Sequence, residues 1–297
     1  MTAERLQSLF ETAGVDGYLH AVEVRSGREV GYEPDTPVVA ASTFKLPVLV
    51  GLFRQADAGQ IDLTEQVAVP VEGRAPGPTG LSVLLDPVRV SWRDLAQLMM
   101  AVSDNAATDV ICERIGLDSV NRTMRELGLT DTVIEDDCRG IFRTLAEDAG
   151  VASLTDVPMV PPPGLLTELR ALKPATTDRT TPRDMTRLLR LIYTDAAASR
   201  ESCEQMRRIL LNQVWPHRLA AGFPEDDVFT AGKTGTLFVW RNEVGAVGYP
   251  DGSLFAVAVY TRARQPRIKD PRADAVIGAA ARAAVDALRG AASGPVG

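Results

Sequence analysis

Two of the four lysines in this chain belong to short motifs that also contain hydroxyl side chains. Ser42 and Lys45 form an S-x-x-K motif, and Lys233 begins the K-T-G motif of residues 233–235. Nearly all other basic residues are arginines, so these two lysines stand out from ordinary surface charge. A serine hydroxyl becomes a good nucleophile when a nearby uncharged amine takes its proton. The spacing therefore predicts covalent serine chemistry in which lysines, and no histidine, handle the protons.

A third motif, S-D-N at residues 103–105, lies between the other two in the chain. Ser103 can pass a proton between a lysine and the leaving group of a substrate. Asn105 can hold Lys45 and a substrate amide, whereas Asp104 is better suited to cap or brace the turn. The set S-x-x-K, S-D-N and K-T-G is the one found in penicillin-recognising serine enzymes.

The residue types around Ser42 and Lys233 predict two further functions. Because Ser42 is expected to begin a helix, the helix dipole and its free N–H groups would stabilise an oxyanion. The N–H group of Thr236 would complete this oxyanion hole. Lys233 and Thr234 offer a cation and a hydroxyl to a substrate carboxylate, and Gly235 lets a substrate approach the strand edge closely.

Two simpler interpretations remain open for these motifs. Ser42 could be an N-cap serine with a solvated lysine after it, although Phe44 and the apolar residues 46–48 surround the pair. The run that begins at Gly232 could be a phosphate-binding loop. That loop requires a glycine five residues earlier, where this chain has Asp227, and a helix afterwards, where the sequence favours a strand.

Composition excludes several classes of function. The 297 residues carry a net charge of −7, which argues against a nucleic-acid binder with a basic face. No run of 18 apolar residues is present, so we expect no membrane span. His20 and His217 are interpreted as structural, and without a C-x-x-C motif we expect no metal and no cofactor.

Cysteine usage and the N-terminal residues predict a cytoplasmic location. Cys112, Cys138 and Cys203 are scattered and odd in number, which favours reduced thiols over a disulfide framework. The first residues show no basic segment followed by an apolar one, so no secretory signal is recognised. An exported protein whose signal has been removed is the alternative.

Hydrophobic periodicity predicts strands at both ends of the chain and helices between them. The expected helices are 6–13, 42–58, 92–100, 105–115, 121–127, 181–193, 202–211 and 273–288, and the expected strands are 17–25, 29–32, 228–231, 237–241, 244–249 and 254–261. Residues 290–297 are interpreted as a frayed tail. Residues 1–38 and 214–297 would form one α/β lobe, residues 39–213 an all-helical lobe, and the site would lie between them.

With its three motifs in order, and with the helix start at residues 180–184, the chain resembles the class A β-lactamase family over most of its length. The resemblance implies an α/β (α+β) fold, with a five-stranded antiparallel sheet flanked by helices and an all-helical lobe. It implies that Ser42 is the acylated nucleophile and that Lys45 and Ser103 move protons. It also implies that Lys233 and Thr234 bind the carboxylate of a small β-lactam, amide or ester.

One departure from this family concerns hydrolysis of the acyl-enzyme. The β-lactamases of the family carry an E-x-x-L-N motif whose glutamate activates the deacylating water. The nearest counterpart here has Leu166 and Arg170 at the Glu and Asn positions, with Glu168 two residues late. Asp178 and Glu147 are other candidate carboxylates that do not match the motif. We therefore expect acylation at Ser42 but slow deacylation.

Three functions fit these observations. The first is a β-lactamase-like serine hydrolase, and the second is a cytoplasmic serine esterase or amidase on the same scaffold. The third is a covalent binder of β-lactams that stays acylated. The sequence separates them only through the water-activating carboxylate, which it does not identify.

Overall fold

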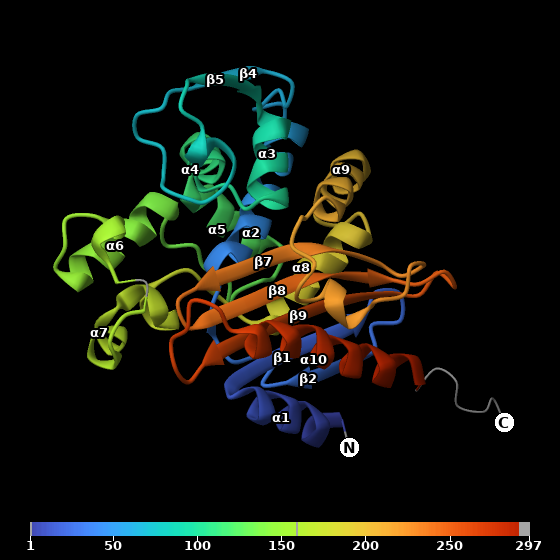
Figure 1. Ribbon diagram of the computed structural model, residues 1–297. Helices are drawn as coiled ribbons and strands as arrows, with labels where there is room; N and C mark the ends of the chain where they lie inside the picture. Colours follow the sequence, from blue (N-terminus) through green and yellow to red (C-terminus); the bar gives the residue numbers. More distant parts are fainter. Residues whose placement is uncertain (1, 159, 291–297) are drawn as a thin grey trace.

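The computed structural model describes residues 2–158 and 160–290 (Figure 1). Its centre is a five-stranded antiparallel sheet with the order β2-β1-β9-β8-β7. The strands are β1 (Val15–Glu23), β2 (Glu29–Tyr32), β7 (Phe229–Leu237), β8 (Trp240–Gly248) and β9 (Leu254–Ala263). Both ends of the chain contribute to this sheet, so the predicted fold class is confirmed.

Ten α-helices surround the sheet or stand beyond its β7 edge within the described residues. They are α1 (Thr2–Ala13), α2 (Lys45–Asp57), α3 (Trp92–Ala101), α4 (Asn105–Ile115), α5 (Leu117–Glu126), α6 (Cys138–Ala149), α7 (Pro163–Glu168), α8 (Pro182–Tyr193), α9 (Arg200–Leu211) and α10 (Pro271–Gly290). Helical periodicity in the sequence predicted most of these helices, but it did not predict α6 or α7. Of the predicted tail, Gly290 ends α10, and residues 291–297 lie outside the described residues.

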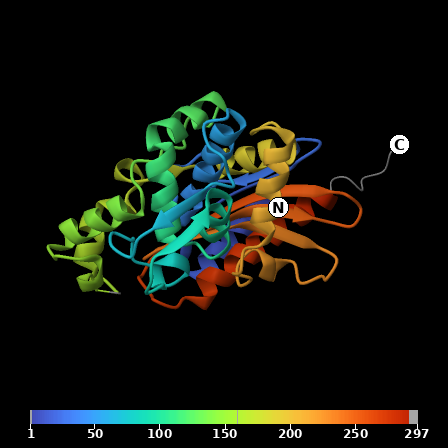
Figure 2. The same cartoon turned by 90° about the horizontal axis from the view of Figure 1, so that it is seen from above.

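The helices form layers on both faces of the sheet. In Figure 1, α1 and α10 lie along one face, where Leu6, Phe10 and Ile277 belong to one buried cluster. Helix α8 packs on the opposite face, and α3 and α4 stand beyond β7. In Figure 2, α6 and α7 project on the side opposite the C-terminus. The division into lobes near residues 38 and 213 stays a prediction.

Two predictions about strands were wrong. The expected strand at 237–241 spans a hairpin, because β7 ends at Leu237 and β8 begins at Trp240. Phe238 turns the chain there with φ 47°, a left-handed conformation that its aromatic type does not suggest. Strands also occur in the middle of the chain, where β3 (Val38–Val39) pairs with β6 (Arg179–Thr180) and β4 (Gln66–Val69) pairs with β5 (Val88–Ser91).

The start of α8 follows the pattern expected from its sequence. The side chain of Thr181 accepts a hydrogen bond from the N–H of Asp184, and Pro182 occupies the first turn, where a missing N–H costs little. In the part of the chain that the structure describes, no helix is long and apolar enough to cross a membrane.

Candidate active site

Ser42 lies in a short 3₁₀ turn (Ala41–Phe44) that leads into α2, and Lys45 is the first residue of that helix. The turn is anchored to the sheet, because the hydroxyl of Thr43 lies 2.9 Å from that of Tyr260 and donates to the Ala40 carbonyl at 2.7 Å. Ser42 remains partly exposed between buried neighbours. The turn therefore leaves the Ser42 side chain partly accessible while its neighbours in the turn are buried.

Lys45 is fully buried beneath this turn. Its Nζ donates to the Ser103 carbonyl and to Asn105 Oδ1, each at 2.8 Å, and to Ser103 Oγ at 3.3 Å. Burial lowers the pKa of Lys45, because desolvation disfavours the charged ammonium. The lowered pKa makes the uncharged amine, which can accept a proton, more populated than in a solvated lysine.

Lys233 reaches the same hydroxyl from the opposite side. Its Nζ donates to Ser103 Oγ at 2.9 Å and to the Thr234 carbonyl at 2.8 Å. Burial, followed by the positive charge of Lys45, lowers the pKa of Lys233 well below its ordinary value. Ser103 thus lies between two amines, as a proton relay requires.

Asp104 holds the loop that carries Ser103 and Asn105. Its buried carboxylate accepts from the Leu81 N–H at 2.6 Å and from the Ala107 N–H at 3.2 Å, which makes it the N-cap of α4. The predicted capping role of Asp104 is confirmed.

We expect Asp104→Ala to lower the free energy of unfolding by about 1–3 kcal/mol, since it leaves a buried N–H and a helix start without partners. Urea denaturation would measure the loss. Asp118→Ala, which changes an exposed aspartate in the first turn of α5, serves as the control. An equal, small loss in both variants would show that the Asp104 carboxylate does not brace the site.

A cavity of about 300 Å³ opens in front of these groups. Its lining is Ser42, Pro78, Thr79, Val102, Ser103, Asn105, Trp215, His217, Arg218, Thr234 and Thr236. Most of the predicted site residues are in this set, whereas the side chains of Lys45 and Lys233 are fully buried and do not line it. No motif in the sequence marked Trp215 or Arg218 as part of the site.

Gly235 has a different neighbour from the one expected. A Cβ atom at this position would lie 3.0 Å from the Ala40 carbonyl oxygen and 3.2 Å from the Thr43 nitrogen. The absence of a side chain therefore lets β7 lie against the 3₁₀ turn, rather than only admitting a substrate. This contact brings the strand of Thr236 beside the turn of Ser42, as a shared oxyanion hole requires.

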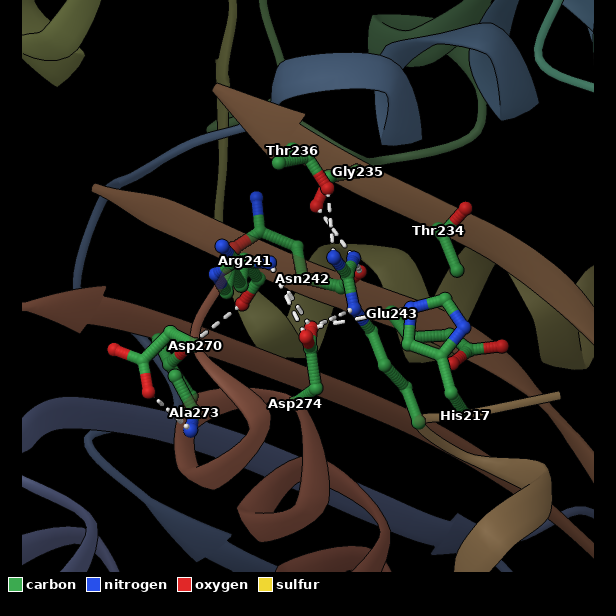
Figure 3. A network of polar contacts seen from close by, with 12 residues as sticks. His217, Thr234, Gly235, Thr236, Arg241, Asn242, Glu243, Asp270, Ala273 and Asp274 are labelled. Atoms are coloured by element: carbon green, nitrogen blue, oxygen red, sulfur yellow. Dashed lines mark hydrogen bonds and ion pairs between the residues drawn. The ribbon is translucent and has the colours of Figure 1, made fainter. Parts of the chain in front are cut away.

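Arg218 supports the cavity wall from beneath. Its guanidinium donates to the carbonyls of Gly235 at 2.8 Å and Asn242 at 3.0 Å, and to Thr236 Oγ1 at 2.7 Å. It also forms an ion pair with Asp274 at 2.8 Å. Asp274 lies at the centre of the network in Figure 3. No motif marks this arginine among the many others, so the sequence could not reveal it.

His217, which was interpreted as structural, lines the cavity. Its Nε2 lies 4.0 Å from Asp274 Oδ1 (Figure 3). Its ring packs edge-on against that of Trp215. Burial, followed by the positive charge of Arg218, lowers the pKa of His217. At neutral pH an uncharged imidazole is therefore favoured in the wall.

Gln213 and Glu243 fix the strand that carries the K-T-G motif. The N–H of Thr234 donates to Gln213 Oε1 at 2.6 Å, and Gln213 Nε2 donates to Glu243 Oε1 at 2.7 Å. The other oxygen of Glu243 accepts from the Leu219 N–H at 2.7 Å, while burial raises the pKa of Glu243 to about 7. These contacts hold β7 to the segment that bears Arg218.

None of the candidate deacylating carboxylates lines this cavity among the described residues. Glu147 and Glu168 are exposed, and Glu147 pairs with Arg170 at 2.9 Å. Asp178 is buried, and its carboxyl accepts from two backbone N–H groups while burial raises its pKa to about 8. Leu166 packs against the hydrophobic core. The segment compared with E-x-x-L-N therefore places no base at Ser42.

Comparisons of sequence agree with this architecture. A family described as the beta-lactamase enzyme family matches residues 1–288. The "Beta-lactamase regulatory protein BlaB" of Streptomyces cacaoi is 31% identical over 301 residues, with 96% of each chain covered. A "Beta-lactamase" of Amycolatopsis lactamdurans is 26% identical over 281 residues, which cover 91% of this chain and 80% of the relative.

Solved structures show the same fold. A β-lactamase from Sphaerobacter thermophilus superposes with a TM-score of 0.78 at 27% identity, covering 99% of this chain and 98% of its own. The protein PBP-A gives a TM-score of 0.78 at 24% identity, covering 97% of this chain and 96% of its own. A mutant of PBP-A is described as an acyl-enzyme complex with penicillin G.

Proposed function

The chain belongs to the beta-lactamase enzyme family, and we propose that it is a serine hydrolase acylated at Ser42 by a β-lactam or a related amide or ester. One observation carries this proposal: two buried lysines converge on the hydroxyl of Ser103 behind the cavity that Ser42 lines. Such a set can take a proton from a nucleophile and deliver it to a leaving group.

Acylation would use these groups in sequence. The uncharged amine of Lys45 takes the proton of Ser42 as its oxygen attacks the carbonyl carbon. The N–H groups of Ser42 and Thr236 stabilise the oxyanion. The proton then passes through Ser103 to the leaving nitrogen or oxygen, and the C–N or C–O bond breaks. In a β-lactam the leaving group stays attached, so the adduct keeps the whole mass of the substrate.

The substrate would carry a carboxylate next to the bond that breaks. Thr234 and Thr236 present hydroxyl groups to one side of the cavity, the buried guanidinium of Arg218 donates to the Thr236 hydroxyl, and the buried amine of Lys233 lies behind Thr234. A carboxylate here would favour the ammonium form of Lys233, because opposite charges stabilise each other in a buried site.

The acyl part of the substrate would be apolar. A second cavity, of about 390 Å³, shares Pro78, Asn105 and Thr236 with the first. Its other lining residues are mostly apolar: Pro76, Gly77, Phe142, Leu145, Leu154, Leu237, Phe238, Arg241, Arg267 and Ile268. An aromatic or aliphatic acyl group would leave water on entering it, which favours binding.

Hydrolysis of the acyl-enzyme would be slow, because no carboxylate lines the cavity in the described part of the chain. A chromogenic cephalosporin mixed with the protein tests this function. We expect a burst of roughly one equivalent followed by a slow steady state. Complete absence of a burst and of turnover, with the folded protein in excess, would overturn the proposal.

Lys233→Ala is expected to slow acylation by carboxylate-bearing substrates far more than acylation by neutral esters, because it removes the amine that a bound carboxylate would hold in its ammonium form. Acylation rates with a penicillin and with an uncharged phenyl ester would measure the difference. The control is Lys173→Ala, which removes an exposed lysine outside the cavity. Equal losses for both substrate types would show that Lys233 only shapes the site.

A further inference from the structure

The first residue of α6 is Cys138, and its backbone is held firmly in place. Asp137 caps the helix by accepting from the Gly140 N–H at 2.8 Å. From α4, the carboxylate of Asp109 accepts from the N–H groups of Cys138 at 2.8 Å and Arg139 at 3.1 Å. These bonds tie the start of α6 to α4, the helix that begins at Asn105, and so fix the direction of the Cα–Cβ bond of Cys138.

The thiol of Cys138 points at the groups that serve Ser42. Its Sγ donates to Asn105 Oδ1 at 3.5 Å, and the same oxygen accepts from Lys45 Nζ at 2.8 Å. The amide nitrogen of Asn105 donates to the Pro76 carbonyl at 2.8 Å, which fixes the orientation of the amide. Cys138 therefore reaches the Lys45–Asn105 pair from an element that carries none of the three motifs.

A deacylating water is activated only if a side chain near Lys45 and Asn105 can accept a proton from it. Lys45 and Ser103 already serve the acylation step, and Asn105 is an amide that cannot take a proton from water. A thiolate could act as a base, but burial raises the pKa of Cys138, so its thiol stays protonated. The Cys138 side chain thus brings a neutral donor to a place where a carboxylate would be an acceptor.

We propose that Cys138 sets the lifetime of the acyl-enzyme, because its uncharged thiol occupies the position from which a carboxylate would activate the deacylating water. The inference rests on the proposed acylation of Ser42. In the natural chain the thiol donates to Asn105, and the proposal gives it no part in the acylation step.

The step that a base at this position would catalyse is hydrolysis of the ester between the acyl group and Ser42. Water attacks the ester carbonyl carbon of the acyl-serine, and a base takes one proton from that water. The bond between the carbonyl carbon and Ser42 Oγ then breaks, and Oγ receives the proton from the base. The products are the free serine and a carboxylic acid, so no further reactant is needed. A carboxylate at position 138 could perform both proton transfers.

Cys138→Glu and Cys138→Asp test this inference, because each places carboxylate oxygens one or two bonds beyond the position of the sulfur. After acylation with penicillin G and removal of excess, intact mass spectrometry would follow loss of the adduct. We expect at least one variant to lose the adduct at least ~100-fold faster than the natural protein, within the usual range of a general base. Cys138→Gln, which has the shape of glutamate without its charge, should keep a long-lived adduct.

The dependence on pH separates a base from a loosened structure. In the carboxylate variant, loss of the adduct should speed up as pH rises through the pKa of the new side chain and then level off. Cys203→Ser, which changes a buried thiol on α9, should leave the lifetime of the adduct unchanged.

The outcomes also separate this inference from the proposed function. If the natural protein forms no adduct, the proposed function fails. If it forms one, and both carboxylate variants form it with an unchanged lifetime, only the role of Cys138 is overturned. Loss of acylation in both carboxylate variants while Cys138→Gln still acylates would also overturn it, because position 138 then cannot hold a useful carboxylate.

Discussion

Ser42→Ala is expected to abolish covalent labelling by penicillin G while leaving thermal unfolding unchanged. The hydroxyl of Ser42 is partly exposed, whereas the turn is held by Thr43 through its contacts with Ala40 and Tyr260. Its removal deletes the nucleophile without deleting the contacts that form the turn. Intact mass after incubation with penicillin G would show the loss.

The control for this variant is Ser8→Ala, which changes an exposed serine on α1. It should be labelled like the natural protein. Peptide mapping that places the adduct of the natural protein on another serine would contradict the assignment of Ser42.

Lys45→Arg is expected to slow acylation by at least ~100-fold, as loss of a general base usually does. Arginine keeps the positive charge but stays protonated at any pH used for the assay. Stopped-flow measurement of the burst with a chromogenic cephalosporin would give the rate. Lys173→Arg, on the exposed surface, should change nothing.

The same assignment predicts how acylation depends on pH. Because burial lowers the pKa of Lys45, the uncharged base is populated below the ordinary lysine value of 10.5. The acylation rate of the natural protein should therefore rise with pH and level off below 10.5. A near-normal rate for Lys45→Arg, with an unchanged pH profile, would remove Lys45 from the mechanism.

The motifs could be read from the sequence because their chemistry is encoded by residue type and short spacing. Ser42 and Lys45 lie one turn apart, and Ser103 and Asn105 flank a capping aspartate. The sheet was predictable for a similar reason, since alternation along the terminal segments marks half-buried strands. Both the motifs and the strand alternation are recognised from residues that lie only a few positions apart in the sequence.

The remaining part of the site depends on contacts between distant segments. Arg218 reaches the carbonyl groups of Gly235 and Asn242, and Cys138 reaches Asn105 across 33 residues of chain. The residues next to Arg218 and Cys138 in the sequence do not indicate such contacts. The segment near residue 166 places no base in the cavity, whereas the fold brings the start of α6 to the pair formed by Lys45 and Asn105.

A time course of intact mass for the natural protein with penicillin G is the strongest test of acylation at Ser42. We expect one adduct per chain with the full mass of penicillin G, mapped to Ser42 and lost only slowly. A protein that forms no adduct and hydrolyses no penicillin would contradict acylation at Ser42. Rapid hydrolysis with no detectable adduct would contradict slow deacylation, because a base would then act on the acyl-enzyme.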